Sequence, residues 1–275
     1  YDGRLERKNI RAKRFIRFWI CRKGVRLIQG FLLRRLWLWR NRLVPSIFLF
    51  FFMPILLFTM ISIPLKNIIR YSISGVPYDI WVFPGLIFII GSLGLYPIIY
   101  REIFDLRVHR KVLLNIALAP YSKSQLVFGN LCVAVLEALI MCLFSILIYS
   151  SIVSISLNFS NFLFLIFCLV IYLFLVGNIY ILLSISIDAI TTMILSSFVL
   201  IFFMIFGNGF LIEFSFFPSF MESILKYSPI SFSQQCYQRF TSTGNFDWMF
   251  IAIQVILTNI LFVLNGYLLK RKLRQ

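Results

Sequence analysis

The chain has 275 residues, of which 60% are hydrophobic and 13% are charged, and its mean hydropathy is +0.91. This composition excludes an ordinary water-soluble enzyme, because a solvated surface needs far more charge. The formal net charge of +17 would suit a nucleic-acid partner, but the basic residues lie between hydrophobic runs, as the positive-inside rule requires. We therefore predict an all-α membrane protein that binds no nucleic acid.

A basic N-terminal segment, residues 1–42, comes first. It carries 14 Lys and Arg residues from Arg4 to Arg42, interleaved with aromatic residues such as Trp37 and Trp39. No window in it is apolar enough to cross a bilayer, and this mixture is typical of a helix lying in the headgroup layer. We predict an N-terminal interfacial amphipathic helix.

Residues 43–275 are predicted to form one transmembrane domain. A bilayer core about 30 Å thick needs roughly 20 apolar residues per helix. Six runs qualify, and we place the spans at residues 43–64, 80–100, 126–150, 162–184, 191–206 and 248–269. Pro54 lies inside the first span, where it predicts a kink.

The stretch over residues 207–228 is apolar but interrupted by glycines and by Pro218. Open backbone cannot face lipid, so we predict a re-entrant helical hairpin before the last span. Gly207 and Gly209 in this stretch are candidates for the translocation path or its gate.

The distribution of Lys and Arg predicts the orientation. The N-terminal segment, the loop after the second span and the C-terminal tail carry 23 of them, against four on the opposite side. Both termini are therefore expected on the cytoplasmic side, or on the stromal side in a plastid. Alanine is scarce while Phe, Ile and Asn are abundant, a bias typical of AT-rich genomes. A plastid (chloroplast) membrane or a bacterial cytoplasmic membrane is the expected location.

Catalytic motifs are missing from the sequence. It contains no G-x-x-x-x-G-K-[ST] loop, so we do not expect this chain to hydrolyse ATP itself. His109 is the one histidine, and the five cysteines are scattered without a C-x-x-C pair. We therefore predict a protein that is no enzyme and has no catalytic residues, no metal site and no cofactor of its own.

Two acidic residues stand in unusual positions. Glu137 lies near the middle of the third span, where a carboxylate costs about 2.5–3.5 kcal/mol on insertion scales. It is either a residue of the translocation path or gate, or a protonated or hydrogen-bonded contact between helices. Asp188 lies in the short turn between the fourth and fifth spans, where it either caps the helix start at Thr191 and Thr192 or contacts a cytoplasmic partner.

The segment from Tyr100 to Asn130 is charged and amphipathic and joins the second and third spans. Its landmarks are Glu102, Arg110, Lys111, Leu113, Leu114, Leu118, Pro120, Ser122, Ser124, Leu126 and Gly129. Four further landmarks lie outside this segment: the aromatic-Pro-Gly start of the second span, Pro218, Pro229 and the basic end near Lys272. The order of all these landmarks is the same as in ABC-2 type exporter permeases. This chain resembles that family over about Leu33 to Gln275. The branch it resembles most contains lipooligosaccharide and drug exporters and the transport permeases encoded in red-algal plastids. Asn115 stands where that family often has an acidic residue.

The resemblance implies a six-span subunit that pairs as a homodimer or a heterodimer and docks on two copies of an ABC ATP-binding subunit, which bind the ATP. The coupling segment, residues 101–125, would carry a short helix on the ATPase. The residues implied in this coupling are Arg110, Lys111, Leu113, Leu114, Leu118 and Pro120. Asp188, from its position in the turn, is a further candidate for contact with the ATPase. The alternative for this loop is a solvated connector without a partner.

The leading hypothesis is thus ATP-driven export of a drug, lipid or glycan of amphipathic or lipid-linked character. The alternative is an ion-coupled secondary transporter or channel, for which only Glu137 offers an ionisable residue at the midplane. A haem-delivery permease is a third class, but His109 in a basic loop offers no haem ligand.

Overall fold

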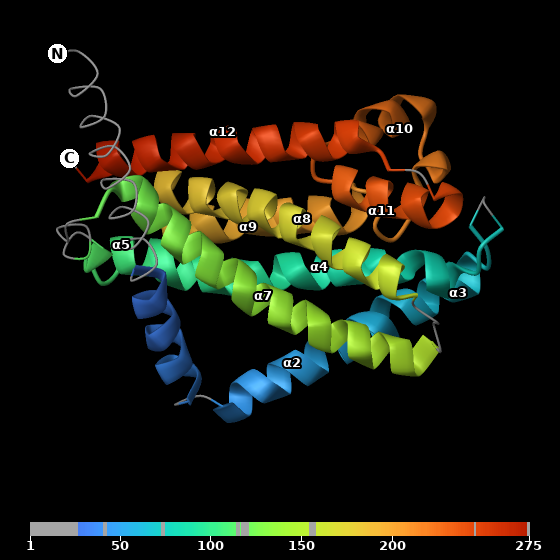
Figure 1. Ribbon diagram of the computed structural model, residues 1–275, viewed down its shortest axis with the longest axis horizontal. Helices are drawn as coiled ribbons and strands as arrows, with labels where there is room; N and C mark the ends of the chain where they lie inside the picture. The colour runs from blue at the N-terminus through green and yellow to red at the C-terminus, as the bar shows by residue number, and fades with distance from the viewer. Residues whose placement is uncertain are drawn as a thin grey trace, which may run out of the picture.

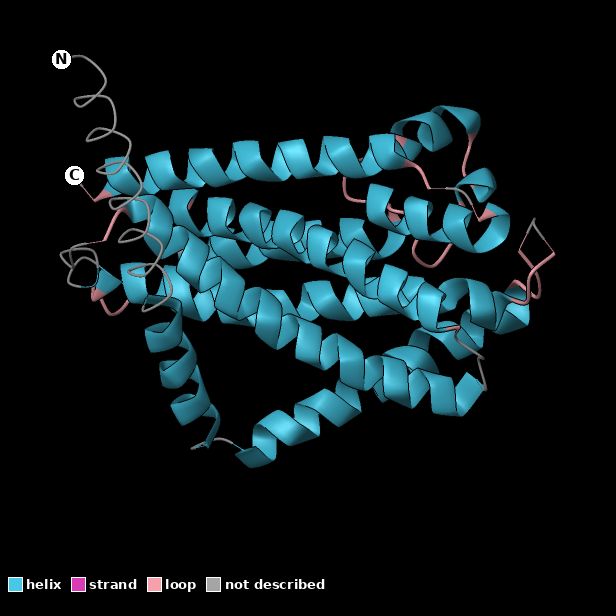
Figure 2. Ribbon diagram, viewed as in Figure 1, coloured by secondary structure: helices cyan, strands magenta, loops and turns pink. Residues whose placement is uncertain are grey.

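The computed structural model describes residues 27–40, 43–72, 75–113, 116, 121–153, 158–244 and 246–273. Within these ranges the regular structure is helical and contains no strand (Figure 2). The long helices lie side by side as a bundle (Figure 1). The predicted all-α class is confirmed.

The helices follow one another with short connections. In chain order they are an N-terminal helix over residues 27–40, α2 (Leu43–Leu57), the π-helical turn η1 (Phe58–Ser62), α3 (Ile63–Ile68), α4 (Tyr78–Ile99), the π-helical stretch η2 (Tyr100–Asp105), α5 (Leu106–Val108), α7 (Lys123–Val153), α8 (Phe159–Ser186), α9 (Ile190–Phe206), the 3-10 turn η3 (Phe214–Phe216), α10 (Ser219–Lys226), α11 (Phe232–Thr243) and α12 (Trp248–Lys272).

Five of these helical segments, taken from the described ranges, are long and apolar enough to cross a membrane. They are Ser46–Ile68, Tyr78–Val108, Lys123–Val153, Phe159–Ser186 and Trp248–Lys272. The chain is therefore a multi-pass α-helical membrane protein. The one predicted span outside these five, residues 191–206, corresponds to α9, which has 17 residues and is about 25 Å long at the α-helical rise. Six crossings remain a prediction.

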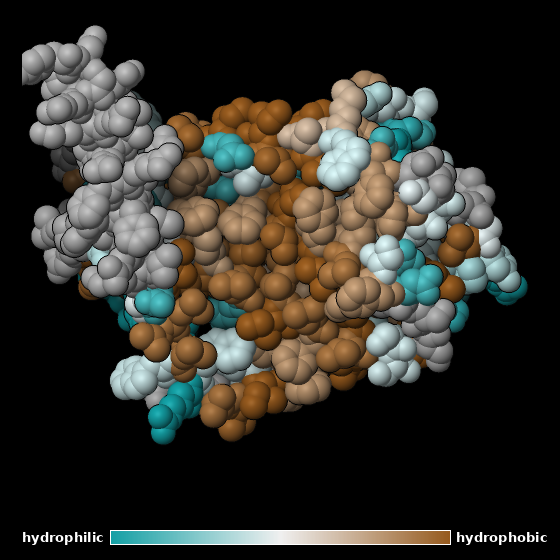
Figure 3. Space-filling view, viewed as in Figure 1, coloured by the Kyte–Doolittle hydropathy of each residue, from teal (hydrophilic) through white to brown (hydrophobic). Residues whose placement is uncertain are grey.

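Hydrophobic residues cover most of the face seen in Figure 3, and hydrophilic ones gather toward its two ends. The N-terminal helix, α5 and the last turn of α12 lie at one end of the bundle, and α10 and α11 lie at the other (Figure 1). We call these the α5 end and the α10 end.

Helix α4 is the central helix of the bundle. In the most apolar stretch of its segment, Tyr78–Val108, 83% is buried inside the protein, whereas only 22% of the corresponding stretch of α12 is buried. Glycines let its neighbours approach closely. A Cβ atom on Gly91 would lie 2.8 Å from the Leu173 side chain of α8, and one on Gly94 would lie 3.0 Å from Met141 of α7. Small residues at helix contacts are the usual means of close packing within a membrane.

The first two spans differ from the prediction in length. The first continues beyond Pro64 to Ile68 through the turn η1, which begins four residues after Pro54. The second continues beyond Tyr100 to Val108 through η2, so the first residues of the predicted coupling segment extend the span itself. π-Helical turns insert an extra residue into a helix without ending it.

The helical hairpin predicted over residues 207–228 is wrong in its extent. Residues 207–213 are irregular, yet Asn208, Phe210 and Leu211 are buried. Helix α10 lies within the predicted range, whereas α11 lies beyond it and was not predicted. Irregular backbone is tolerated here because it faces protein instead of lipid.

Packing and hydrogen bonds hold this irregular stretch against the bundle. The Gln234 amide donates to the Gly209 carbonyl over 2.9 Å, and the Tyr78 hydroxyl donates to the Leu211 carbonyl over 3.0 Å. A Cβ on Gly85 would lie 2.0 Å from the Phe210 carbonyl oxygen, so only glycine fits at that position of α4. Two backbone carbonyls of the stretch thus find donors inside the protein.

Candidate functional site

Glu137 of α7 is bound by the N-terminal helix. The Nε atom of Arg35 lies 2.9 Å from its Oε2 atom, and the Trp39 indole N–H donates to its Oε1 atom over 2.8 Å. A charged group away from water needs such partners, since an unpaired charge there is very costly. Glu137 is therefore a hydrogen-bonded contact between helices, which is one of its two predicted roles.

A second carboxylate extends this contact. Glu102, in η2, forms ion pairs with Arg34 and with Arg35, the latter over 3.4 Å. The side chains of Arg35 and Glu102 are only 8% and 9% exposed. The N-terminal helix is thus fastened to the helical segments Tyr78–Val108 and Lys123–Val153 by one network of buried and partly buried charges.

A cavity of about 370 Å³ lies beside this network, between the N-terminal helix, α2, α4 and α7. Charged side chains line one part of it and apolar side chains line the rest. Its lining residues are Arg35, Leu38, Trp39, Ser46, Phe50, Met53, Leu93, Gly94, Pro97, Ile98, Arg101, Glu137 and Met141. Glu137 therefore does line a cavity, although its role as a gate stays a prediction.

At the α5 end, Asp188 joins three parts of the chain. Arg107 of α5 donates to the Asp188 carboxylate and to the Ile187 carbonyl, while Nζ of Lys272 in α12 lies 2.6 Å from the same carboxylate. Hydrogen bonding from Lys272, and then from Arg107, lowers the pKa of Asp188. The carboxylate is charged and holds the α8–α9 turn to both helices.

The alternative that Asp188 caps helix α9 is wrong. The residue that precedes the first helical position is Ala189, and no side chain makes the capping hydrogen bond there. The carboxylate is instead engaged by two cations, Arg107 and Lys272. Contact between Asp188 and a partner protein stays a prediction.

Three other predicted coupling residues, Arg110, Lys111 and Leu113, follow α5 in the chain. Arg110 is 2.9 Å from Asp105 in an ion pair, and exposed Lys111 has a φ of 53° where the chain turns. Leu113 is only 3% exposed and packs in the core of its own chain, so in this conformation its side chain cannot fill a groove on another protein. Three further candidates, Leu114, Leu118 and Pro120, lie outside the described residues.

The two predicted gate glycines have structural reasons to be glycine. Gly209 has a φ of +70°, in the left-handed region that favours this residue. A Cβ on Gly207 would lie 2.8 Å from the Phe203 carbonyl oxygen. Both sit at the junction where α9 gives way to the buried irregular stretch, and their role as a gate stays a prediction.

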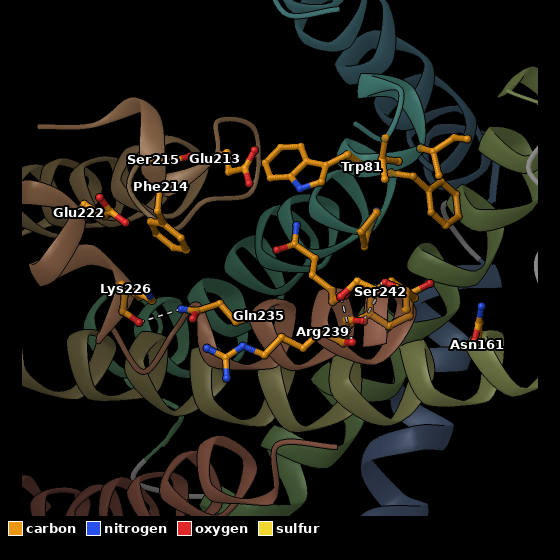
Figure 4. Close-up of a pocket in the computed structure, with 17 residues that line it drawn as sticks. Trp81, Asn161, Glu213, Phe214, Ser215, Glu222, Lys226, Gln235, Arg239 and Ser242 are labelled. Atoms are coloured by element: carbon orange, nitrogen blue, oxygen red, sulfur yellow. Dashed lines mark hydrogen bonds between the residues drawn. The ribbon is translucent and has the colours of Figure 1, made fainter. Parts of the chain in front are cut away.

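A larger pocket of about 550 Å³ opens at the α10 end (Figure 4). Trp81 projects from the start of α4 toward Glu213, while α10 contributes Glu222 and Lys226. The full lining is Val76, Ile80, Trp81, Phe83, Pro84, Asn161, Glu213, Phe214, Ser215, Glu222, Lys226, Gln235, Tyr237, Gln238, Arg239, Thr241 and Ser242. These residues bring together four parts of the chain that the sequence separates.

Sequence reasoning missed Arg35 and this pocket, although signals for both existed. A carboxylate within a span needs a positively charged or hydrogen-bonding partner, and the basic N-terminal segment contains many candidates. Helix α11 is bracketed by Pro229 and by Gly244, whose φ of +72° ends the helix in the usual glycine conformation.

No protein-family model matches this chain, and a search of curated proteins finds no matching sequence.

Proposed function

We propose that this chain is the transmembrane permease subunit of an ATP-binding-cassette exporter, which moves an amphipathic or lipid-linked substrate and is powered by a separate ATPase subunit. The proposal combines the order of sequence landmarks with the contacts at the α5 end. It also takes the α5 end as cytoplasmic, in keeping with the basic residues gathered there.

The contacts of Asp188 are the observation that carries the proposal. Arg107 lies in the last turn of the helical segment Tyr78–Val108. Its bonds to Ile187 and Asp188 connect it to the α8–α9 turn, which Lys272 connects to α12. A displacement applied to the segment after the second span would therefore reach the ends of three other helices. A lever of this kind is what a permease without a nucleotide site of its own needs.

The cavity beside Glu137 supports the amphipathic character of the cargo. Its apolar wall suits a hydrocarbon chain, while Arg35, Arg101 and Glu137 suit a polar group at one end. Such a lining is expected where a substrate leaves the cytoplasmic leaflet.

The ion-coupled transporter remains the alternative, but the pairing of Glu137 weakens it. A carboxylate that couples transport to an ion must exchange protons or cations with water. Glu137 is held by Arg35 and Trp39, and Glu102 by Arg34 and Arg35. Both carboxylates are thus engaged by the N-terminal helix.

The test is capture of an ATPase. The tagged chain is purified from its native membrane in mild detergent, and co-purifying proteins are identified by mass spectrometry. We expect a subunit with a Walker A loop and ATPase activity, and we expect Leu114→Asp and Leu118→Asp to abolish the capture. Ile224→Asp is the matched control, because Ile224 is an exposed apolar residue at the α10 end. Equal capture by all three variants would reject the coupling assignment, and no ATPase with the wild type would reject the exporter.

A further inference from the structure

The wall of the pocket at the α10 end combines one aromatic face with many polar groups. Trp81 is partly buried and projects from α4 toward Glu213, and Gln235 and Arg239 of α11 lie across the pocket from it (Figure 4). Apolar Phe83 and Pro84 complete the α4 side. A ligand that fits must therefore offer an apolar face to an indole ring and a polar edge to the other walls.

Charged side chains of both signs surround the pocket. Glu213 and Glu222 face Lys226 and Arg239, and Arg239 also forms an ion pair with Asp247. This leaves no positive excess to neutralise a phosphate or a carboxylate, and the two cations in the same wall disfavour a cationic ligand. This mixture of charges, without an excess of positive charge, favours an uncharged group over an anion.

The amides supply hydrogen bonds without charge. Gln235 is held in place by bonds from its Nε2 atom to the Lys226 carbonyl and to the Ser231 hydroxyl, each of 2.8 Å. The Nε2 atom of Gln238, in contrast, is buried and meets no acceptor among the residues that the structure describes. A buried donor without an acceptor is costly in free energy, so this amide favours a ligand that brings an acceptor.

We propose that this pocket binds an uncharged sugar residue. A pyranose ring has an apolar C–H face for Trp81, and its hydroxyl groups both donate and accept, as carboxylates next to amides require. The inference rests on the proposed function, since it assigns a glycan headgroup to the lipid-linked cargo and places its binding at the far end from the ATPase.

The test is a binding measurement on the full chain in lipid nanodiscs. Methyl glucoside, methyl mannoside and N-acetylglucosamine are titrated while tryptophan fluorescence is followed, with glucuronate and phosphocholine as charged comparisons. We expect at least one uncharged sugar to give a saturable change that Trp81→Phe abolishes. Trp248→Phe is the matched control and should keep the change, because Trp248 lies at the same end, is 65% exposed and does not line the pocket.

A second variant guards against a folding defect in the first. Gln238→Leu leaves every tryptophan in place and should weaken sugar binding about tenfold, the loss expected for one hydrogen bond of about 1.4 kcal/mol. Unchanged affinity in both Trp81→Phe and Gln238→Leu would overturn the site. Saturable binding of phosphocholine or glucuronate without sugar binding would overturn the ligand class.

The two proposals fail separately. If an ATPase co-purifies but no sugar binds, the sugar site is rejected and the exporter stands. If sugar binds through Trp81 but no ATPase is captured, the pocket stands and the exporter is rejected.

Discussion

The two ends of the bundle are held by different chemistry. At the α5 end, ion pairs such as Asp188 with Arg107 and Lys272 join segments far apart in the chain. At the α10 end, the irregular stretch is held by buried rings and by neutral hydrogen bonds, with Phe210 packed between Phe88 and Tyr172, each at 5.7 Å. Ion pairs near the surface are weak and exchange readily, whereas buried packing is costly to disturb. The comparison indicates an adjustable α5 end and a rigid α10 end.

The largest effect is expected from removing the ring at the rigid end. Phe210→Ala should lower the free energy of unfolding by about 3–5 kcal/mol, because it leaves a cavity beneath α4. Thermal unfolding of the detergent-solubilised protein measures the loss. Phe202→Ala is the control, since Phe202 is 55% exposed on α9 and should change little. Equal losses in the two variants would show that the irregular stretch is no rigid element.

The network around Glu137 should show the next largest effect. Glu137→Gln leaves buried Arg35 with Glu102 alone, at 3.4 Å, and we expect a loss of about 2 kcal/mol, less than for a fully orphaned buried charge. Glu137→Ala should lose more, because Trp39 also loses its acceptor. Limited proteolysis measures how firmly the N-terminal helix is held in each of the two variants. Transport assays measure their activity.

A double variant decides whether charge is the cause. Glu137→Gln combined with Arg35→Gln should recover part of the stability that Glu137→Gln loses, because the buried guanidinium that lost one of its two carboxylates is removed, while Glu102 keeps Arg34. Additive losses would contradict the pairing. If Glu137→Gln and Glu137→Ala each left transport and assembly unchanged, both roles of Glu137, as a gate and as a helix contact, would be rejected.

A neutral hydrogen bond at the rigid end should give a smaller effect. Gln234→Leu leaves the Gly209 carbonyl without its amide donor, so we expect a loss of about 1–2 kcal/mol in thermal unfolding. Asn259→Leu is the control, because Asn259 is exposed on α12 and bonds only within its own helix, to the Val255 carbonyl. A larger loss in the control would show that polar groups on the outer face matter more than the buried contact.

The smallest effect is expected from Asp188, whose side chain is 64% exposed. Asp188→Asn should cost less than about 1 kcal/mol at neutral pH, and about 1 M salt should reduce the difference. The folded state lowers the pKa of Asp188, so its stabilisation is present above the unfolded value of about 3.9 and is lost as pH falls through the folded value. Unfolding temperatures of both proteins from neutral to acid pH should therefore converge below about pH 4. A difference that grows in acid would contradict the ion pairs.

Part of the fold followed directly from the sequence. The predicted spans at 162–184 and 248–269 correspond to α8 and α12 with small changes at their ends. Such runs are recognisable because the cost of moving a helix from water to lipid is a sum over neighbouring residues. The sequence also indicated that the helix is interrupted at Gly207 and Gly209. It did not indicate the conformation of the residues that follow.

Only the tertiary structure decided which residues meet. Glu137 lies about a hundred positions from Arg35 and Trp39, and the pocket at the α10 end joins Trp81 to residues beyond 160. Hydropathy gives the length of a helix, but not its rotation about its axis, its tilt or its neighbours, and these set every contact between distant residues. The sequence by itself thus determined that the chain forms membrane helices. Packing among them, which depends on the shapes of all side chains together, decided where the charged network and the pocket lie.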